Sequence, residues 1–134
     1  MQIQPYLFFN GRCEEALEFY RKTLNAEIVM LMRFKDSPDP VNCASAGLEK
    51  IMHASFRIGE TTLLASDGRC EGGLNFKGFA LTLNVPNAAE AERLFTALSD
   101  GGMVLMPLAK TFYAEKFGML ADRFGVNWMI IVTP

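Results

Sequence analysis

The chain has a single histidine, His53, which lies in the apolar segment IMHASFRI at residues 51–58. Imidazole is the side chain best suited to moving protons near neutral pH, provided that a carboxylate orients it or raises its basicity. Asp67 directly follows the next apolar segment, TTLLAS, and is a candidate partner. His53 and Asp67 are therefore candidates for acid–base catalysis. A strand histidine that only hydrogen-bonds to a neighbour would give the same pattern.

Other side chains suit the binding of a ligand. Arg33 ends a strongly apolar segment, where its guanidinium is either a fork for a carboxylate or phosphonate or an ordinary charge at a strand end. Aromatic residues on predicted strands either line a cavity or fill the core, and they are Tyr6, Phe8, Tyr113 and Trp128. The predicted ligand-binding residues are Arg33, His53, Tyr113 and Trp128.

The three cysteines do not indicate thiol chemistry. Cys13, Cys43 and Cys70 are odd in number and form no CxxC pair, so we expect reduced thiols. The glycine pairs at 72–73 and 101–102 lack the strand–GxGxxG–helix context of a dinucleotide site. No segment resembles a P-loop, a nucleophile elbow or an S-adenosylmethionine loop.

The elements that would position these residues repeat once along the chain. A strand at 5–9 leads through Asn10-Gly11 into a helix at 13–24, whose apolar stripe contains Cys13, Leu17 and Tyr20. Asn25 follows as a left-handed C-terminal residue. Strands are predicted at 27–34, 51–58 and 61–66, the last two forming a hairpin.

The second half follows the same plan. A strand at 78–85 precedes a helix that starts at a capping box, Asn87 to Glu90, and stops at Gly101-Gly102. Strands follow at 103–106, 112–120 and 127–132. We therefore expect an α+β fold, a single domain of two βαβββ modules at about 1–68 and 76–134 with a linker at about 69–75. The segment 35–49 is long enough for a lid or a dimer contact.

Two βαβββ modules with the segments PYLFFNGRCEEALEFY and MHASFRIGETTLLASDG resemble the PhnB-like group of the vicinal oxygen chelate superfamily. This superfamily includes glyoxalases, bleomycin-resistance proteins and extradiol dioxygenases. The resemblance implies cupped mixed β-sheets and a homodimer. Some relatives carry a methyltransferase label, which finds no support in these residues.

The resemblance also implies where metal ligands would stand, and those positions are unsuitable here. They correspond to Pro5, about Leu63, Phe79 or Ala80, and Met129. None of these residues binds a hard or borderline cation, and a shift by one residue does not restore a set. Such sites usually need two histidines, whereas this chain has one. We therefore expect no metal at the usual site and no cofactor.

Composition limits the remaining possibilities. A net charge of -2 gives no reason to expect nucleic acid. No apolar run approaches the roughly 18 residues of a membrane span, and residues 1–10 lack signal-peptide features, so we expect a cytoplasmic protein without a membrane partner.

Three functions remain open. The leading prediction is metal-independent small-molecule binding, as in drug-sequestering resistance proteins. An alternative is an enzyme (lyase, dioxygenase or transferase-like) with a site relocated to His53 and Asp67, including a divalent metal held there with Cys43 or Glu60. A non-catalytic interaction module is the third possibility.

Overall fold

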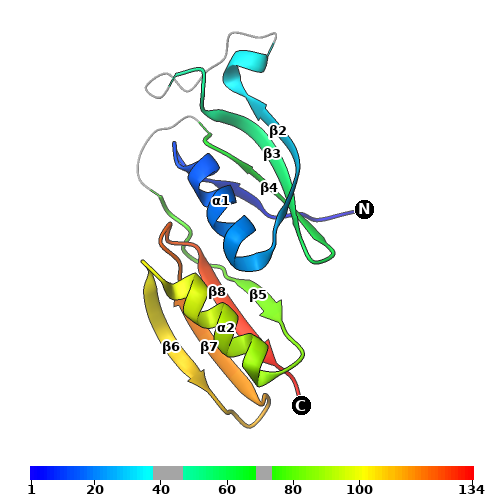
Figure 1. Cartoon of the computed structure of the whole chain (residues 1–134), viewed down its shortest axis with the longest axis vertical. Helices are drawn as coiled ribbons and strands as arrows, with labels where there is room; N and C mark the ends of the chain where they lie inside the picture. The colour runs from blue at the N-terminus through cyan, green and yellow to red at the C-terminus, as the bar shows by residue number, and fades with distance from the viewer. Residues whose placement is uncertain (38–46, 69–73) are drawn as a thin grey trace. The chain divides into compact units, whose positions relative to one another are not determined.

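The computed structural model describes residues 1–37, 47–68 and 74–134. The chain divides into two compact units, Met1–Leu74 and Asn75–Pro134, which we call module 1 and module 2. In its described residues each module contains four strands and one α-helix in the order βαβββ (Figure 1). The predicted α+β fold of two tandem βαβββ modules is confirmed.

Each module is one continuous segment of the chain. Module 1 contains β1 (Tyr6–Phe8), α1 (Cys13–Leu24), β2 (Glu27–Arg33), the short 3-10 helix η1 (Phe34–Asp36), β3 (Ile51–Ile58) and β4 (Thr61–Ser66). Module 2 contains β5 (Leu81–Asn84), α2 (Ala88–Ser99), β6 (Met103–Ala109), β7 (Lys116–Ala121) and β8 (Asn127–Val132).

The two sheets have the same topology. Sheet A has the strand order β1-β4-β3-β2, and sheet B has the order β5-β8-β7-β6. The first strand of each module pairs in parallel with the last strand, and the other pairs are antiparallel. The weak repeat in the sequence is thus a repeat of one supersecondary unit.

Helix α1 covers one face of sheet A (Figure 1). Its buried stripe includes Cys13, Leu17 and Tyr20, and the Tyr20 ring stacks on Phe56 of β3 with centroids 6.0 Å apart. Strand alternation buries Ala54 and Phe56 and leaves His53, Ser55 and Arg57 on the opposite face, as predicted. We call this opposite side the open face of sheet A.

Helix α2 covers one face of sheet B in the same way. Gly118 of β7 permits this packing, because a Cβ there would lie 2.7 Å from the Phe95 ring of α2. Trp128 and Ile130 are buried on this helix-covered face. The other side of the sheet is its open face.

The helix ends follow the predicted signals in part. Asn25 adopts a left-handed conformation with φ 54° at the end of α1, and the Asn87 side chain accepts a 2.8 Å bond from the Glu90 amide at the start of α2. The Glu90 carboxylate pairs with Arg93, on its own helix. In the described residues, neither α-helix is long and apolar enough to cross a membrane.

The strand boundaries differ most from prediction in module 2. β5 is shorter than 78–85, and β6 continues past residue 106 through Pro107, which an edge strand tolerates because it has an unpaired side. β7 starts at Lys116 because Thr111 forms a turn, in which its hydroxyl accepts a 3.0 Å bond from the Ala114 amide. Most of the predicted lid segment, residues 38–46, and most of the linker, residues 69–73, lie outside the described residues.

Candidate functional site

The open face of sheet A carries aromatic, sulfur-containing and polar side chains. One row runs across the strands from Tyr6 through Leu64 and Ser55 to Met30, and a second places His53 beside Met32. Phe8 shares this face with Tyr6, two residues along β1. Exposed apolar side chains that cluster in this way are typical of a binding surface.

Tyr6 and His53 form the central polar contact of this face. The Tyr6 hydroxyl lies 2.8 Å from His53 Nδ1, at hydrogen-bond distance, and the two ring centroids are 5.5 Å apart. The Phe8 ring stacks on Tyr6 with centroids 4.8 Å apart and an interplanar angle of 23°. Tyr6 remains 38% exposed and Phe8 51% exposed, so the cluster is accessible from solvent.

Asp67 does not take part in this cluster. Its carboxylate, only 1% exposed, accepts bonds from three backbone amides: Gly11 at 2.7 Å, Cys13 at 2.8 Å and Ile51 at 2.8 Å. These bonds tie the start of α1 to the start of β3. The predicted pairing of His53 with Asp67 is therefore replaced by the pairing of His53 with Tyr6.

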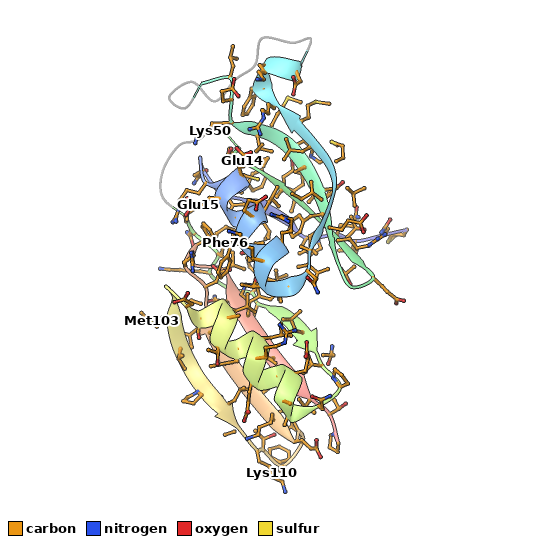
Figure 2. All side chains as sticks on the ribbon, viewed as in Figure 1. Glu14, Glu15, Lys50, Phe76, Met103 and Lys110 are labelled. Carbon is orange, nitrogen blue, oxygen red and sulfur yellow. The ribbon has the colours of Figure 1, made fainter. Side chains whose placement is uncertain are left out.

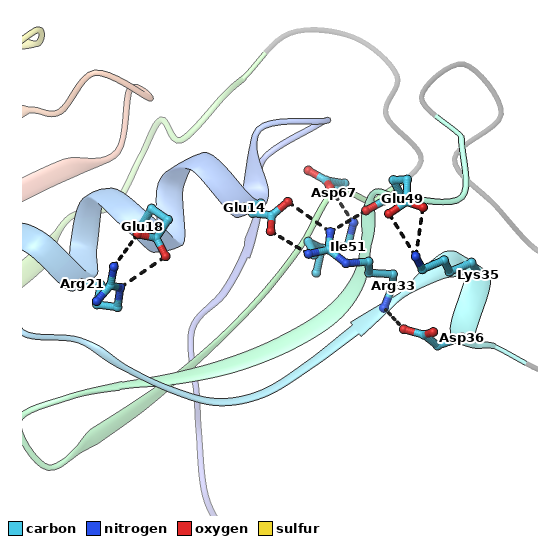
Figure 3. A network of polar contacts seen from close by, with 9 residues as sticks. All are labelled: Glu14, Glu18, Arg21, Arg33, Lys35, Asp36, Glu49, Ile51 and Asp67. Carbon is cyan, nitrogen blue, oxygen red and sulfur yellow. Dashed lines mark hydrogen bonds and ion pairs between the residues drawn. The ribbon is translucent and has the colours of Figure 1, made fainter.

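Arg33 lies in a separate network at the C-terminal end of β2 (Figure 3). Its guanidinium holds both carboxylate oxygens of Glu14, at 3.1 and 2.6 Å, and donates to the Glu49 carbonyl at 2.7 Å. The Arg33 side chain is 23% exposed. The fork predicted to meet a ligand is occupied by a carboxylate of the chain itself.

A small pocket of about 90 Å³ lies beside this network. Its walls are formed by Gly11, Glu14, Glu49, Lys50, Ile51 and Asp67. The Lys50 ammonium already donates to the Gly11 carbonyl at 2.8 Å. Pockets for drug-sized ligands measure about 300–1,000 Å³, so this one is too small for such a ligand.

The remaining predicted ligand-binding residues both lie in module 2. Trp128 is buried on the helix-covered face, where its indole N–H donates to Asp122 at 2.9 Å. The structure thus gives no support to a ligand contact by Trp128. Tyr113 is exposed, but it lies in the turn before β7 rather than on a strand, and it packs edge-on against Phe112 and Phe117.

The open face of sheet B is uncharged across three rows of paired residues. The central row joins Thr82, Met129, Met119 and Met106. The flanking rows are Asn84, Ile131, Phe117 and Ala109 on one side, and Asn127, Ala121 and Met103 on the other. Methionine side chains adapt to ligands and partners of varied shape, so this face is suited to contact with an apolar surface of another molecule.

The Cys13 thiol is poorly suited to chemistry. It is buried at the start of α1, and this burial, reinforced by the nearby charges of Asp67 and Glu14, raises the pKa of the Cys13 thiol far above its usual range. A thiol kept protonated is a weak nucleophile and a weak metal ligand. Cys43 and Cys70 lie outside the described residues.

No metal site is formed by the residues that the structure describes. Within residues 1–37, 47–68 and 74–134, no three His, Cys, Asp or Glu side chains gather closely enough to hold an ion. His53 is hydrogen-bonded to a phenol, and Asp67 to three amides. A histidine and a carboxylate held in these hydrogen bonds do not form a binding site for a divalent metal ion.

Signals in the sequence could have identified part of this arrangement. Alternation alone places Tyr6 and Phe8 on one face, and His53 and Ser55 on one face. The missing information was the strand order, which puts β1 and β3 on either side of β4 and brings the two faces together.

Comparison with known proteins identifies the family. The model of the family described as 3-demethylubiquinone-9 3-methyltransferase matches residues 1–131. Protein YjdN of Escherichia coli is 36% identical over 141 aligned residues, which cover 98% of this chain and 95% of YjdN.

Solved structures agree with this assignment. Protein PA1353 from Pseudomonas aeruginosa shares 46% identity and a TM-score of 0.87, with 99% of this chain and 98% of that chain covered. A putative 3-demethylubiquinone-9 3-methyltransferase, PhnB protein, from Bacillus cereus shares 27% identity and a TM-score of 0.84, with 99% and 100% covered. More distant glyoxalase-related and bleomycin-resistance structures share the fold alone. The chain therefore belongs to the family described as 3-demethylubiquinone-9 3-methyltransferase, the PhnB-like group of the vicinal oxygen chelate superfamily.

Proposed function

We propose that this protein binds a small molecule without a metal ion, on the open face of sheet A. The observation that carries the proposal is the accessible cluster of Tyr6, Phe8 and His53, held together by the 2.8 Å hydrogen bond and the 4.8 Å ring stack. A largely apolar surface with a few convergent polar groups is the usual composition of a small-molecule site.

The cluster favours a ligand with an apolar or aromatic body and one hydrogen-bonding group. Tyr6 occupies Nδ1 of His53, which leaves Nε2 as the ring nitrogen through which His53 would contact the ligand. Met30, Met32 and Leu64 would provide apolar contacts around it. Arg57, a cation on the same face of β3, pairs with Glu27 and adds little net charge.

Binding is best tested with a panel of small aromatic and aliphatic compounds by ligand-observed NMR on the metal-free protein. We expect at least one compound to bind, and Phe8→Ala to weaken its binding about tenfold or more, as expected for truncation of an aromatic anchor. Phe112→Ala is the matched control, because Phe112 is an aromatic residue that is 99% exposed in module 2. Equal losses in the two variants, or binding that requires added Ni²⁺, Zn²⁺, Fe²⁺ or Mn²⁺, would contradict the proposal.

We also propose that the protein is a homodimer in solution. Support comes from β6, whose residues Met103, Val104, Leu105 and Met106 are all exposed although they are apolar (Figure 2 labels Met103). An apolar edge strand of this kind is normally covered by a partner. Light scattering should give twice the monomer mass, and Leu105→Lys should halve it, whereas Ile3→Lys, at an exposed residue before β1, should not.

The alternatives make different predictions. An enzyme that uses the imidazole of His53 would lose turnover in His53→Gln with an unchanged melting temperature. Asp67 is a weak candidate for such chemistry because its oxygens hold three amides. A flat response to every compound in the panel would favour a non-catalytic interaction module.

A further inference from the structure

Asn10 and Gly11 form the tight turn between β1 and α1. The Arg12 amide donates to the Phe9 carbonyl at 3.1 Å, and both central residues have positive φ, 48° for Asn10 and 103° for Gly11. Asn-Gly is the residue pair that such turns prefer, because both residues tolerate this conformation. The geometry of this turn therefore accounts for the Asn-Gly sequence at positions 10 and 11.

The same pair has an intrinsic reactivity. In a flexible chain the backbone nitrogen of the glycine attacks Cγ of the asparagine side chain, and the C–N bond to the side-chain amide breaks with release of ammonia. The resulting five-membered succinimide then takes up water and opens to aspartate or isoaspartate. Glycine favours this reaction because it has no Cβ to hinder the attack.

In this protein the attacking nitrogen is held in a hydrogen bond. The Gly11 N–H donates to Asp67 Oδ1 at 2.7 Å, and the carboxylate is buried and anchored by the Cys13 and Ile51 amides. For ring closure the nitrogen would have to lose its proton and turn toward Asn10 Cγ. A bond to a fixed carboxylate retains the proton and sets the direction of the N–H.

We propose that Asn10 is a latent deamidation site. In the folded protein, the hydrogen bond that Asp67 accepts from the Gly11 amide prevents the reaction. Only water is required as a co-reactant. The reaction begins when the N-terminus of α1 separates from Asp67, so its rate reports local opening of this region. The product carries a carboxylate at the residue before Gly11, whose amide binds Asp67, and the added negative charge would weaken module 1.

The first test compares the native full chain with a synthetic peptide of residues 7–15 at mildly alkaline pH. Peptide mapping by mass spectrometry follows aspartate and isoaspartate at position 10. We expect the native chain to react at least about tenfold more slowly than the peptide, as a closed local structure requires. Rates within about twofold of each other would overturn the proposal.

The second test assigns the protection to Asp67. Asp67→Asn should accelerate the reaction at Asn10, whereas Asp122→Asn should not. Asp122 is a matched control, since it is a buried aspartate that accepts backbone amide bonds in module 2. Equal acceleration in both variants would contradict a specific role for Asp67.

Hydrogen exchange of the Gly11 amide provides a measurement that does not depend on the folding of a variant. In the unmodified chain, low concentrations of urea should raise the exchange rate and the deamidation rate in the same proportion. Deamidation that proceeds at a constant rate while exchange rises would refute the link between Asp67 and Asn10.

Discussion

The phenol of Tyr6 on β1 and Nδ1 of His53 on β3 lie 2.8 Å apart, although β4 separates the two strands. The contact is possible because both side chains rise from the same face and are long enough to meet above the intervening strand. It gives the single histidine of the chain a defined partner and a defined orientation on an accessible surface.

Tyr6→Phe tests this contact directly. A phenol is a good donor to a neutral imidazole nitrogen, so we expect the wild-type ring to carry its proton on Nε2 and the variant to shift toward the Nδ1-protonated tautomer. Nitrogen chemical shifts of His53 measure the ratio. The free energy of unfolding should fall by no more than about 1 kcal/mol, because the lost bond is partly solvated. An unchanged tautomer ratio would show that the bond does not orient the ring.

The fold was largely predictable because local signals agreed with the final structure. The stripe of α1, the Asn87 cap and the alternation along β3 each specify a local conformation and a buried face. The start of β7 differs from prediction because a single hydroxyl, that of Thr111, forms a turn ahead of Phe112 and Tyr113, whose aromatic side chains favour a strand.

The candidate site was less predictable because it depends on contacts between distant segments. Asp67 follows the strand paired with β3, which made it a reasonable partner for His53. Nothing in its own neighbourhood indicates that the amides of Gly11 and Cys13, more than fifty residues away, occupy the carboxylate. The ion pair of Arg33 is equally hard to predict, because its partner Glu14 lies on α1 and comes close only when the helix packs on the sheet.

Asp67→Ala should be among the most destabilising substitutions in module 1. Removing the carboxylate leaves the buried amides of Cys13 and Ile51 without an acceptor, and each unsatisfied buried donor costs about 1–3 kcal/mol. We expect a loss of at least about 3 kcal/mol in urea unfolding once the Gly11 bond is included. Glu18→Ala, which removes an exposed ion pair with Arg21, should leave the unfolding midpoint nearly unchanged.

The Cys13 thiol should be unreactive in the folded protein. Burial raises its pKa far above the usual range, so little thiolate is present at neutral pH. In a Cys43→Ser, Cys70→Ser variant, iodoacetamide should modify Cys13 only after unfolding by urea. Rapid modification of the native variant would mean that the start of α1 opens readily, and it would also predict rapid deamidation at Asn10.

The ion pair between Glu14 and Arg33 should make a pH-dependent contribution to stability. The hydrogen bonds from Arg33 lower the pKa of Glu14 below its ordinary value of 4.5 (Figure 3). A carboxyl group whose pKa is lower in the folded state stabilises fully above its unfolded pKa and loses that contribution as the pH falls through its folded pKa.

Glu14 is 59% exposed, so solvent screening limits the contribution to less than about 1 kcal/mol. Glu14→Gln should therefore be less stable than the wild type at neutral pH. The difference should shrink as the pH falls below 4.5 and disappear only below the lowered pKa of Glu14, where the folded wild-type carboxyl also becomes neutral. Lys35→Gln, which removes an exposed partner of Glu49 outside this pair, is the control. A difference between wild type and Glu14→Gln that persists in acid would show that Glu14 stabilises by packing rather than by charge.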